Sequence, residues 1–434
     1  MEPWQLTASA ATPMLRDGTL TAEALVRSCL ERIAEREPVT KAWNFLDPQL
    51  ALASAREADK AYTRGVLHGL PLGVKDMIDT ADMPTTHNSP IYQGLRQGRD
   101  AACVGVVRGE GAVILGKTDT VEFAAGGRRA LTRNPHDPTR TPGGSSSGSA
   151  AAVADGMVPL ALGTQTAGSL IRPAAYCGIV SFKPSFGGIN RAGVKPLSDT
   201  LDTVGTMART VPDVALFAAA LSGRSSWLVR PLDQYVSRPL RVGLCHTYEW
   251  PQALPETQAA MQHAADAIQA NTAMVLRDVR LPVDYQQLAQ AQTHIQLAEQ
   301  AQCFAFERLN HWAQLSPRLQ GIVQAGLAVT PEQYDQAQAV VAQCRAQLAE
   351  VFQDVDVLLA PSAAGAAPEG LDNTGDPLFC RIWTVLHTPA VNIPAGLAPN
   401  GLPVGLQVVG PVGADALTLA AAHALHLCLG VSRV

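Results

Sequence analysis

The stretch Thr-Pro-Gly-Gly-Ser-Ser-Ser-Gly-Ser at residues 141–149 runs directly into the alanine-rich segment Ala-Ala-Ala-Val-Ala at 150–154. A glycine and serine loop that leads into a helix has three interpretations: a flexible linker, an anion-binding helix N-terminus, or a place where the backbone approaches a substrate closely. A phosphate loop is disfavoured because no Gly-Lys-Ser/Thr follows. A linker is disfavoured because helix and strand patterns lie close on both sides.

The same stretch contains Gly-Ser-Ser-Ser-Gly at 144–148, which matches the G-x-S-x-G pattern of a nucleophile elbow with Ser146 as the nucleophile. That elbow directly follows a buried strand. Residues 134–142 contain three prolines, which a central strand does not tolerate. The elbow interpretation is therefore disfavoured.

Short apolar runs at 70–74, 112–115 and 157–162 alternate with alanine-rich helical patterns, and strand-like runs return at 355–359, 390–393 and 405–409. This rhythm predicts an α/β fold with a largely buried sheet, and a length of 434 residues leaves the number of domains open at this point. Near the N-terminus, Thr21 is the expected N-cap of an amphipathic helix.

The part from about 226 to 354 is rich in Gln and Ala and poor in Gly. Its long-period patterning predicts a mostly helical insertion or cap. Strands within about 355–411 are expected to complete the sheet.

Composition excludes several classes of protein. Of 434 residues, 47% are hydrophobic and 16% are charged, which predicts a compact globular chain. The net charge is −5 and no run of Lys or Arg occurs, so neither a nucleic acid nor an anionic membrane is an expected partner.

The eight cysteines form no C-x-x-C pair, and the chain has neither a signal-peptide pattern nor an apolar stretch of about 18 residues. A cytoplasmic location is expected. Neither His nor acidic residues show metal-ligand spacing, so no metal and no cofactor are expected.

A second small-residue turn, Gly-Thr-Gln-Thr-Ala-Gly-Ser at 163–169, follows the apolar run 158–162. Further motifs are G-L-P-L-G-V-K-D at 69–76, R-P-A-A-Y-C-G at 172–178 and F-K-P-S at 182–185. Together with a serine 24 positions after Ser145, this ordered set resembles the amidase signature family. The resemblance is strongest over a core of about 61–211 and resumes weakly at 356–362 and 376–410. It implies one α/β/α domain over residues 1–434, with a large, mixed, twisted sheet covered by helices. The helical part at about 226–354 is then expected to be variable and to lie over the mouth of the active site.

The resemblance implies a Ser-Ser-Lys triad: Ser169 attacks the carbonyl, Ser145 relays the proton after a cis peptide bond to Gly144, and Lys75 is the base. A serine hydroxyl is a poor nucleophile until a base takes its proton. Lys75 can be that base only when neutral, and the apolar run 70–74 predicts the burial that lowers its pKa.

The backbone amides of Thr166, Ala167, Gly168 and Ser169 are the expected oxyanion donors. The implied reaction is hydrolysis of an amide C–N bond through an acyl-enzyme on Ser169, with the Ser145 and Lys75 relay protonating the leaving amine.

Two departures bear on the substrate. Many family members carry Thr-Asp and Gly-Gly-Ser where this chain has Thr164-Gln165 and Ala167-Gly168-Ser169. The segment through residue 173 looks like the malonamidase-type branch, in which an arginine holds a substrate carboxylate. Arg172 is therefore the candidate substrate-binding residue, and a purely structural arginine is the alternative.

Met77 and Trp383 are further candidates for substrate binding. The expected substrate is a small molecule: a carboxylate-bearing amide, an aryl amide or a carbamate. The alternative function is the glutamine-hydrolysing subunit of an aminoacyl-tRNA amidotransferase. Three features disfavour it: Gln165 and Ala167 in the second turn, the short connection at 126–132 and the lack of a basic face. A non-catalytic binding protein would leave the three triad residues unexplained, and a homodimer is left open.

Overall fold

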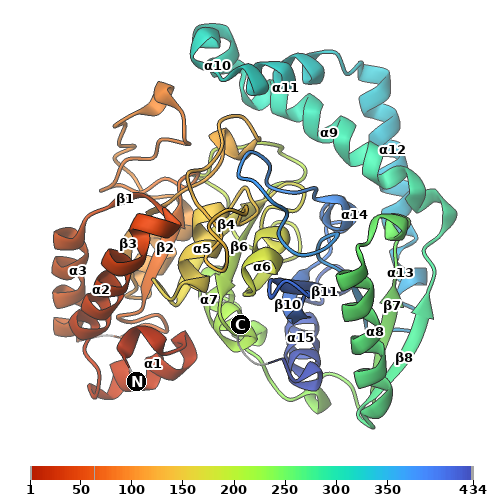
Figure 1. Cartoon of the computed structure of the whole chain (residues 1–434), viewed down its shortest axis with the longest axis horizontal. Helices are drawn as coiled ribbons and strands as arrows, with labels where there is room; N and C mark the ends of the chain where they lie inside the picture. The colour runs from red at the N-terminus through yellow and green to blue at the C-terminus, as the bar shows by residue number, and fades with distance from the viewer. Residues whose placement is uncertain (1, 63, 432–434) are drawn as a thin grey trace.

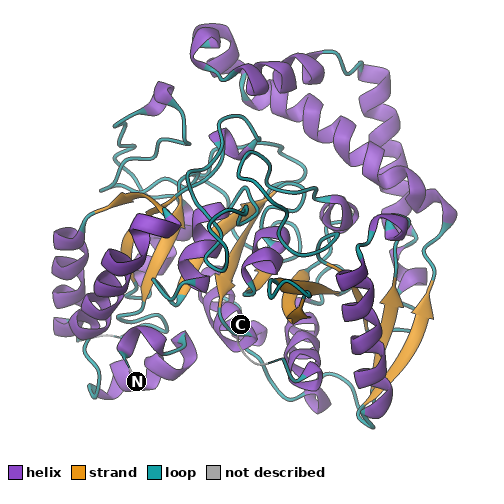
Figure 2. Ribbon diagram, viewed as in Figure 1, coloured by secondary structure: helices purple, strands orange, loops and turns teal. Residues whose placement is uncertain are grey.

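The computed structural model describes residues 2–62 and 64–431, and within them the strands form one 11-stranded sheet (Figures 1 and 2). Its order is β1-β3-β2-β4-β6-β5-β10-β11-β9-β7-β8. The strands are β1 (Trp43–Leu46), β2 (Pro71–Lys75), β3 (Val113–Thr118), β4 (Leu160–Gln165), β5 (Val180–Lys183), β6 (Thr203–Ala208), β7 (Leu240–Cys245), β8 (Met274–Val279), β9 (Val357–Pro361), β10 (Ala390–Leu397) and β11 (Pro403–Val409).

The sheet is mixed and covered on both faces. Strand β2 is parallel to β3 and β4, whereas β10 is antiparallel to β5 and β11. Every residue of β2, β6, β9 and β11 is buried. Successive side chains of a strand point to opposite faces, so full burial means that helices or loops cover both. The predicted α/β domain with a large mixed sheet is confirmed.

Helices surround the sheet. They are α1 (Ala8–Asp17), α2 (Ala22–Thr40), α3 (Pro48–Lys60), α4 (Ala102–Gly109), α5 (Ser147–Ala154), α6 (Ile171–Cys177), α7 (Val211–Ser222), α8 (Pro255–Ala270), α9 (Leu288–Cys303), α10 (Ala305–Asn310), α11 (Pro317–Leu327), α12 (Pro331–Ala346), α13 (Leu348–Val351), α14 (Leu378–Val385) and α15 (Asp415–Leu429). Thr21 caps α2 as predicted, accepting a hydrogen bond from the Ala24 amide at 3.1 Å. No helix within the described ranges is long and apolar enough to cross a membrane.

Helices α9 to α12 form an arm that lies apart from the sheet, at the top and right of Figure 1. In this arm α9 packs against α11 and α12. The arm accounts for the long helical patterning expected within 226–354.

That same part of the chain also contains two strands, β7 and β8, which a mostly helical interpretation did not include. They are parallel to each other, are connected through α8, and extend the sheet beyond β9. Strand β8 is the edge strand of the sheet, with Arg277 and Asp278 exposed, so it has no sustained apolar run. Because the surrounding sequence is rich in Gln and Ala, the short β8 pattern does not stand out from the helical pattern around it.

Candidate active site

Three segments meet at one edge of the sheet. Lys75 is the last residue of β2, and β2 and β4 are parallel neighbours, with Val74 paired to Leu162. Parallel strands end at the same edge, so the turn after β4, which carries Ser169, lies beside Lys75. The Gly/Ser loop brings Ser145 to this edge just before α5 begins at Ser147.

The composition of the Gly/Ser loop follows from close backbone approach. Gly143 has φ +81°, and a Cβ atom there would lie 2.7 Å from the Cα of Pro173. At Gly148, a Cβ atom would lie 2.2 Å from the carbonyl oxygen of Ala42. Larger residues would push apart the segments that meet here. These contacts join segments of the protein, so internal packing accounts for both glycines, and close approach of this backbone to a substrate stays a prediction.

Lys75 is fully buried and lies in a cluster of hydroxyl groups. Its Nζ is 2.7 Å from Ser145 Oγ, 2.8 Å from Thr164 Oγ1 and 3.1 Å from Ser146 Oγ. Burial lowers the pKa of Lys75 to about 7, and the negative charge of Asp202 opposes that shift. A large share of Lys75 is therefore a neutral amine near pH 7, in hydrogen-bond contact with Ser145.

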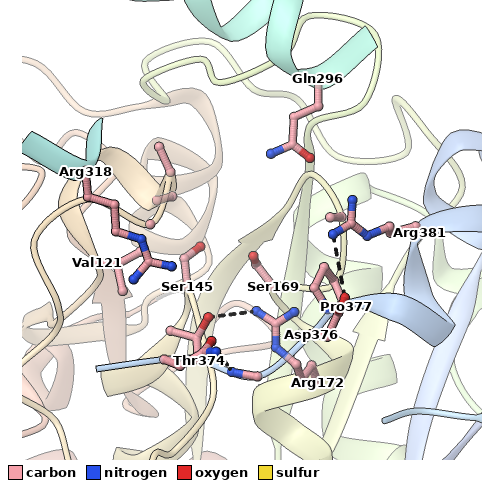
Figure 3. Close-up of a pocket in the computed structure, with 16 residues that line it drawn as sticks. Val121, Ser145, Ser169, Arg172, Gln296, Arg318, Thr374, Asp376, Pro377 and Arg381 are labelled. Atoms are coloured by element: carbon pink, nitrogen blue, oxygen red, sulfur yellow. Dashed lines mark hydrogen bonds and ion pairs between the residues drawn. The ribbon is translucent and has the colours of Figure 1, made fainter. Parts of the chain in front are cut away.

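Ser145 and Ser169 face the same cavity from neighbouring segments (Figure 3). Ser145 is only 3% exposed, and the peptide bond before it is cis. Ser169 is half-buried, so its hydroxyl is accessible from the cavity. Within residues 2–62 and 64–431 no hydrogen bond joins the two hydroxyls. In its described residues the free protein therefore has the Lys75–Ser145 hydrogen bond but not one between Ser145 and Ser169. Hydrogen bonds to a catalytic nucleophile often form fully only when the substrate binds.

The turn between β4 and α6 leaves amide groups free. In the described part of the chain, the N–H groups of Ala167, Gly168 and Ser169 have no acceptor within the protein. Thr166 is anchored by its hydroxyl, which donates to Asp202 at 2.6 Å. A carbonyl oxygen that gains negative charge beside these amides would find preorganised donors.

Gln165 holds this turn in place with both ends of its side chain. Its Oε1 accepts from the amides of Leu170 at 2.8 Å and Ile171 at 3.0 Å. Its Nε2 donates to Thr384 Oγ1 at 2.9 Å, and that hydroxyl donates to the Ala167 carbonyl at 2.7 Å. An acidic side chain here could not donate, so the neutral amide connects the turn to α14 in a way that Asp could not.

A cavity of about 320 Å³ opens above Ser169. Its walls come from the Gly/Ser loop, the segment after β3, the turn before α6, the loop before α14, and helices α9, α11 and α14 (Figure 3). The polar or charged side chains that line it are Ser145, Ser169, Arg172, Gln296, Arg318, Asn373, Thr374, Asp376 and Arg381. Sequence reasoning did not identify Gln296, Arg318 or Arg381, since each looks like an ordinary surface residue of an amphipathic helix.

Arg172 is 4% exposed and lines the floor of this cavity. Its Nη2 donates to the carbonyl of Gly144 at 2.6 Å and to Thr374 Oγ1 at 3.1 Å. In the described residues its Nε and Nη1 have no hydrogen-bond partner. The guanidinium therefore supports the loop that carries Ser145 and retains unused donors.

Met77 and Trp383 lie outside the lining of the cavity. Met77 is 1% exposed and packs in a cluster with Phe123 and Phe304. Trp383 lies on α14, and its side chain is fully buried in the apolar core. The structure thus brings Lys75, Ser145, Ser169 and Arg172 together and places these two candidates in apolar packing.

Comparison with known proteins agrees with this geometry. The amidase family model matches residues 24–419. The glutamyl-tRNA(Gln) amidotransferase A subunit of Chloroflexus aurantiacus (strain ATCC 29366 / DSM 635 / J-10-fl) is 34% identical, with 93% of each chain covered. Its counterpart in Anaeromyxobacter sp. (strain K) is 33% identical, with 95% of this chain and 94% of the relative covered.

Two solved structures are similar over nearly the whole chain. An amidase crystal structure is 30% identical with a TM-score of 0.88, covering 97% of this chain and 99% of the other. The peptide amidase from Stenotrophomonas maltophilia is 29% identical with a TM-score of 0.80, covering 99% and 98%.

The malonamidase-type placement rested on residues 164–173 alone. Similarity over nearly the full length includes amidotransferase A subunits, so that narrower placement is not supported. The family itself is established by a model match that spans most of the chain and by motifs that converge on one cavity. This chain belongs to the amidase signature family.

Proposed function

We propose that this protein hydrolyses the C–N bond of a small amide through an acyl-enzyme on Ser169, with Ser145 and Lys75 as the proton relay. The observation that carries the proposal is the contact between the buried Lys75 amine and Ser145 Oγ at 2.7 Å, beside an accessible serine. A cavity of about 320 Å³ is near the lower end of small-molecule sites, which run from about 300 to 1,000 Å³.

In this mechanism Ser169 Oγ attacks the amide carbon while its proton passes to Ser145 Oγ, whose own proton passes to Lys75 Nζ. Negative charge on the former carbonyl oxygen is stabilised by the free amides of the turn at 167–169. When the C–N bond breaks, the proton returns through the same relay to the leaving amine. Water then attacks the ester, with its proton taken by the relay, and releases the acid.

The test is hydrolysis of a panel by wild type, Ser169→Ala and the control Ser222→Ala, which removes a hydroxyl at the end of α7. The panel contains malonamate, an aryl anilide, a fatty amide, glutamine and an aryl carbamate. We expect amide cleavage by wild type and the control, and its loss in Ser169→Ala. Full activity of Ser169→Ala would exclude this mechanism.

A second candidate is the glutamine-hydrolysing subunit of an aminoacyl-tRNA amidotransferase. It is favoured by 34% identity to such a protein over 93% of this chain. The short connection at 126–132 and the lack of a basic run argue against it. Hydrolysis restricted to glutamine, together with a stable partner protein on purification from the native host, would establish this candidate. A homodimer and a cytoplasmic location stay predictions.

A further inference from the structure

The charges around the cavity are unbalanced. Among the described residues that line it, three carry a guanidinium, Arg172, Arg318 and Arg381, and one carries a carboxylate, Asp376. Asp376 Oδ1 lies 3.6 Å from Arg381 Nη2, and its side chain is 61% exposed. An exposed ion pair at this distance is weak because water screens it. The cavity therefore presents a net positive charge to any molecule that enters.

Arg318 stands in the first turn of α11, where the helix dipole is unfavourable for a cation. Its Nη1 donates to the backbone carbonyl of Asp372 at 3.1 Å. No carboxylate within the described ranges forms an ion pair with it. In Figure 3 its guanidinium points from the arm towards the side of the cavity that carries Ser145.

Arg381 reaches the cavity from the opposite side, on α14 (Figure 3). Its Nη1 is held by α9, donating to Thr293 Oγ1 at 2.8 Å and contacting Gln292 Oε1 at 3.4 Å. These hydrogen bonds orient the guanidinium. Its side chain is 24% exposed, so part of the group stays open to the cavity. Two cations from different helices thus lie on opposite sides of the cavity.

We propose that Arg318 and Arg381 form an anion-selecting pair, and that the substrate is a net-anionic monoamide of a short dicarboxylic acid. This inference rests on the proposed function. It differs from a carboxylate held by Arg172, which lies on the floor beside the Gly144 carbonyl. In a monoamide the amide carbonyl would reach Ser169 while the distal carboxylate lies between the two arginines.

The pair also discriminates against glutamine. Glutamine carries an α-ammonium group as well as a carboxylate, and the only carboxylate among the described lining residues is the exposed Asp376. An ammonium beside two guanidinium groups is repelled. Glutaramate, which is glutamine without that ammonium, avoids the repulsion and keeps the carboxylate.

The experiment compares kcat/KM for glutaramate, glutamine and valeramide, the neutral amide with the same carbon chain. We expect kcat/KM for glutaramate to exceed the values for glutamine and valeramide by roughly 10- to 100-fold. The reason is that hydrogen bonds between a guanidinium and a carboxylate are stronger than those between neutral groups. Arg318→Gln and Arg381→Gln should each raise KM for glutaramate about tenfold, and each should lower kcat/KM for glutaramate several-fold more than kcat/KM for valeramide. The control Arg277→Gln, at the far edge of the sheet, should change neither.

Equal rates on glutaramate and valeramide, a preference for glutamine, or equal losses on both amides in the variants would overturn the inference. If valeramide is cleaved without a preference for glutaramate, only the inference fails and the amidase proposal stands. If no amide is cleaved, the melting temperature is measured with and without glutarate. A rise with glutarate in wild type that is lost in Arg318→Gln supports the arginine pair. No rise in wild type refutes it.

Discussion

Replacing Lys75 with methionine keeps the length of the side chain but removes the amine that lies 2.7 Å from Ser145 Oγ. Because that amine is the base of the proposed relay, Lys75→Met should lose amide hydrolysis by at least about 100-fold. The folded state should persist, since an apolar side chain suits a fully buried position. Circular dichroism on the same sample checks this.

The pH profile of the wild type follows from the pKa of Lys75, which burial lowers to about 7. The active form is the neutral amine, so activity rises with pH and is lost as pH falls through that pKa. The neutral fraction is about one tenth at pH 6 and about nine tenths at pH 8. We therefore expect kcat/KM to rise roughly tenfold between these values and to level off above about pH 8.

The assay is initial-rate hydrolysis of a neutral amide, whose own charge does not change between pH 5 and 10. A lysine with its ordinary pKa would give a rate that still climbs about tenfold per unit at pH 9. Such a climb, or a wild-type profile unchanged in Lys75→Met, would refute the assignment of Lys75 as the base.

Three further outcomes are expected. Asp202→Asn removes a charge that raises the pKa of Lys75, so the midpoint of the pH profile should move to lower pH. Gln165→Leu leaves the amides at the start of α6 without their acceptor, which should cost about 1–3 kcal/mol in unfolding free energy by denaturant titration and lower kcat. Gly148→Ala should lower the unfolding free energy by about 1–3 kcal/mol in the same titration, because its Cβ would lie 2.2 Å from a carbonyl oxygen. In the control Gly105→Ala the new Cβ meets nothing within 4 Å, so the unfolding free energy should not fall.

The three triad residues could be located from sequence because each belongs to a local motif with a strong pattern. Lys75 ends an apolar run that forms a buried strand, and Ser169 follows another. Ser145 stands in a loop whose glycines are required by contacts across the fold. Parallel pairing of the two strands then brings the motifs to one edge.

The arginines that line the cavity from α11 and α14 could not be predicted in the same way. Arg318 and Arg381 lie on amphipathic helices, where a polar side chain facing a cavity has the same pattern as one facing water. Trp383 follows Arg381 by two positions on α14, and residues at that spacing point in different directions, so one lines the cavity and the other is buried in the core. Which face of each helix lines the cavity depends on how α9, α11 and α14 pack in the folded protein.

The most direct test of the central claim is to map a covalent adduct. Wild type treated with a serine-directed fluorophosphonate is digested and analysed by mass spectrometry, with Ser169→Ala and Ser222→Ala treated in parallel. The account predicts one added group, on Ser169, in wild type and in Ser222→Ala, and none in Ser169→Ala. A modification on Ser145 or Ser146 with Ser169 unmodified would contradict it.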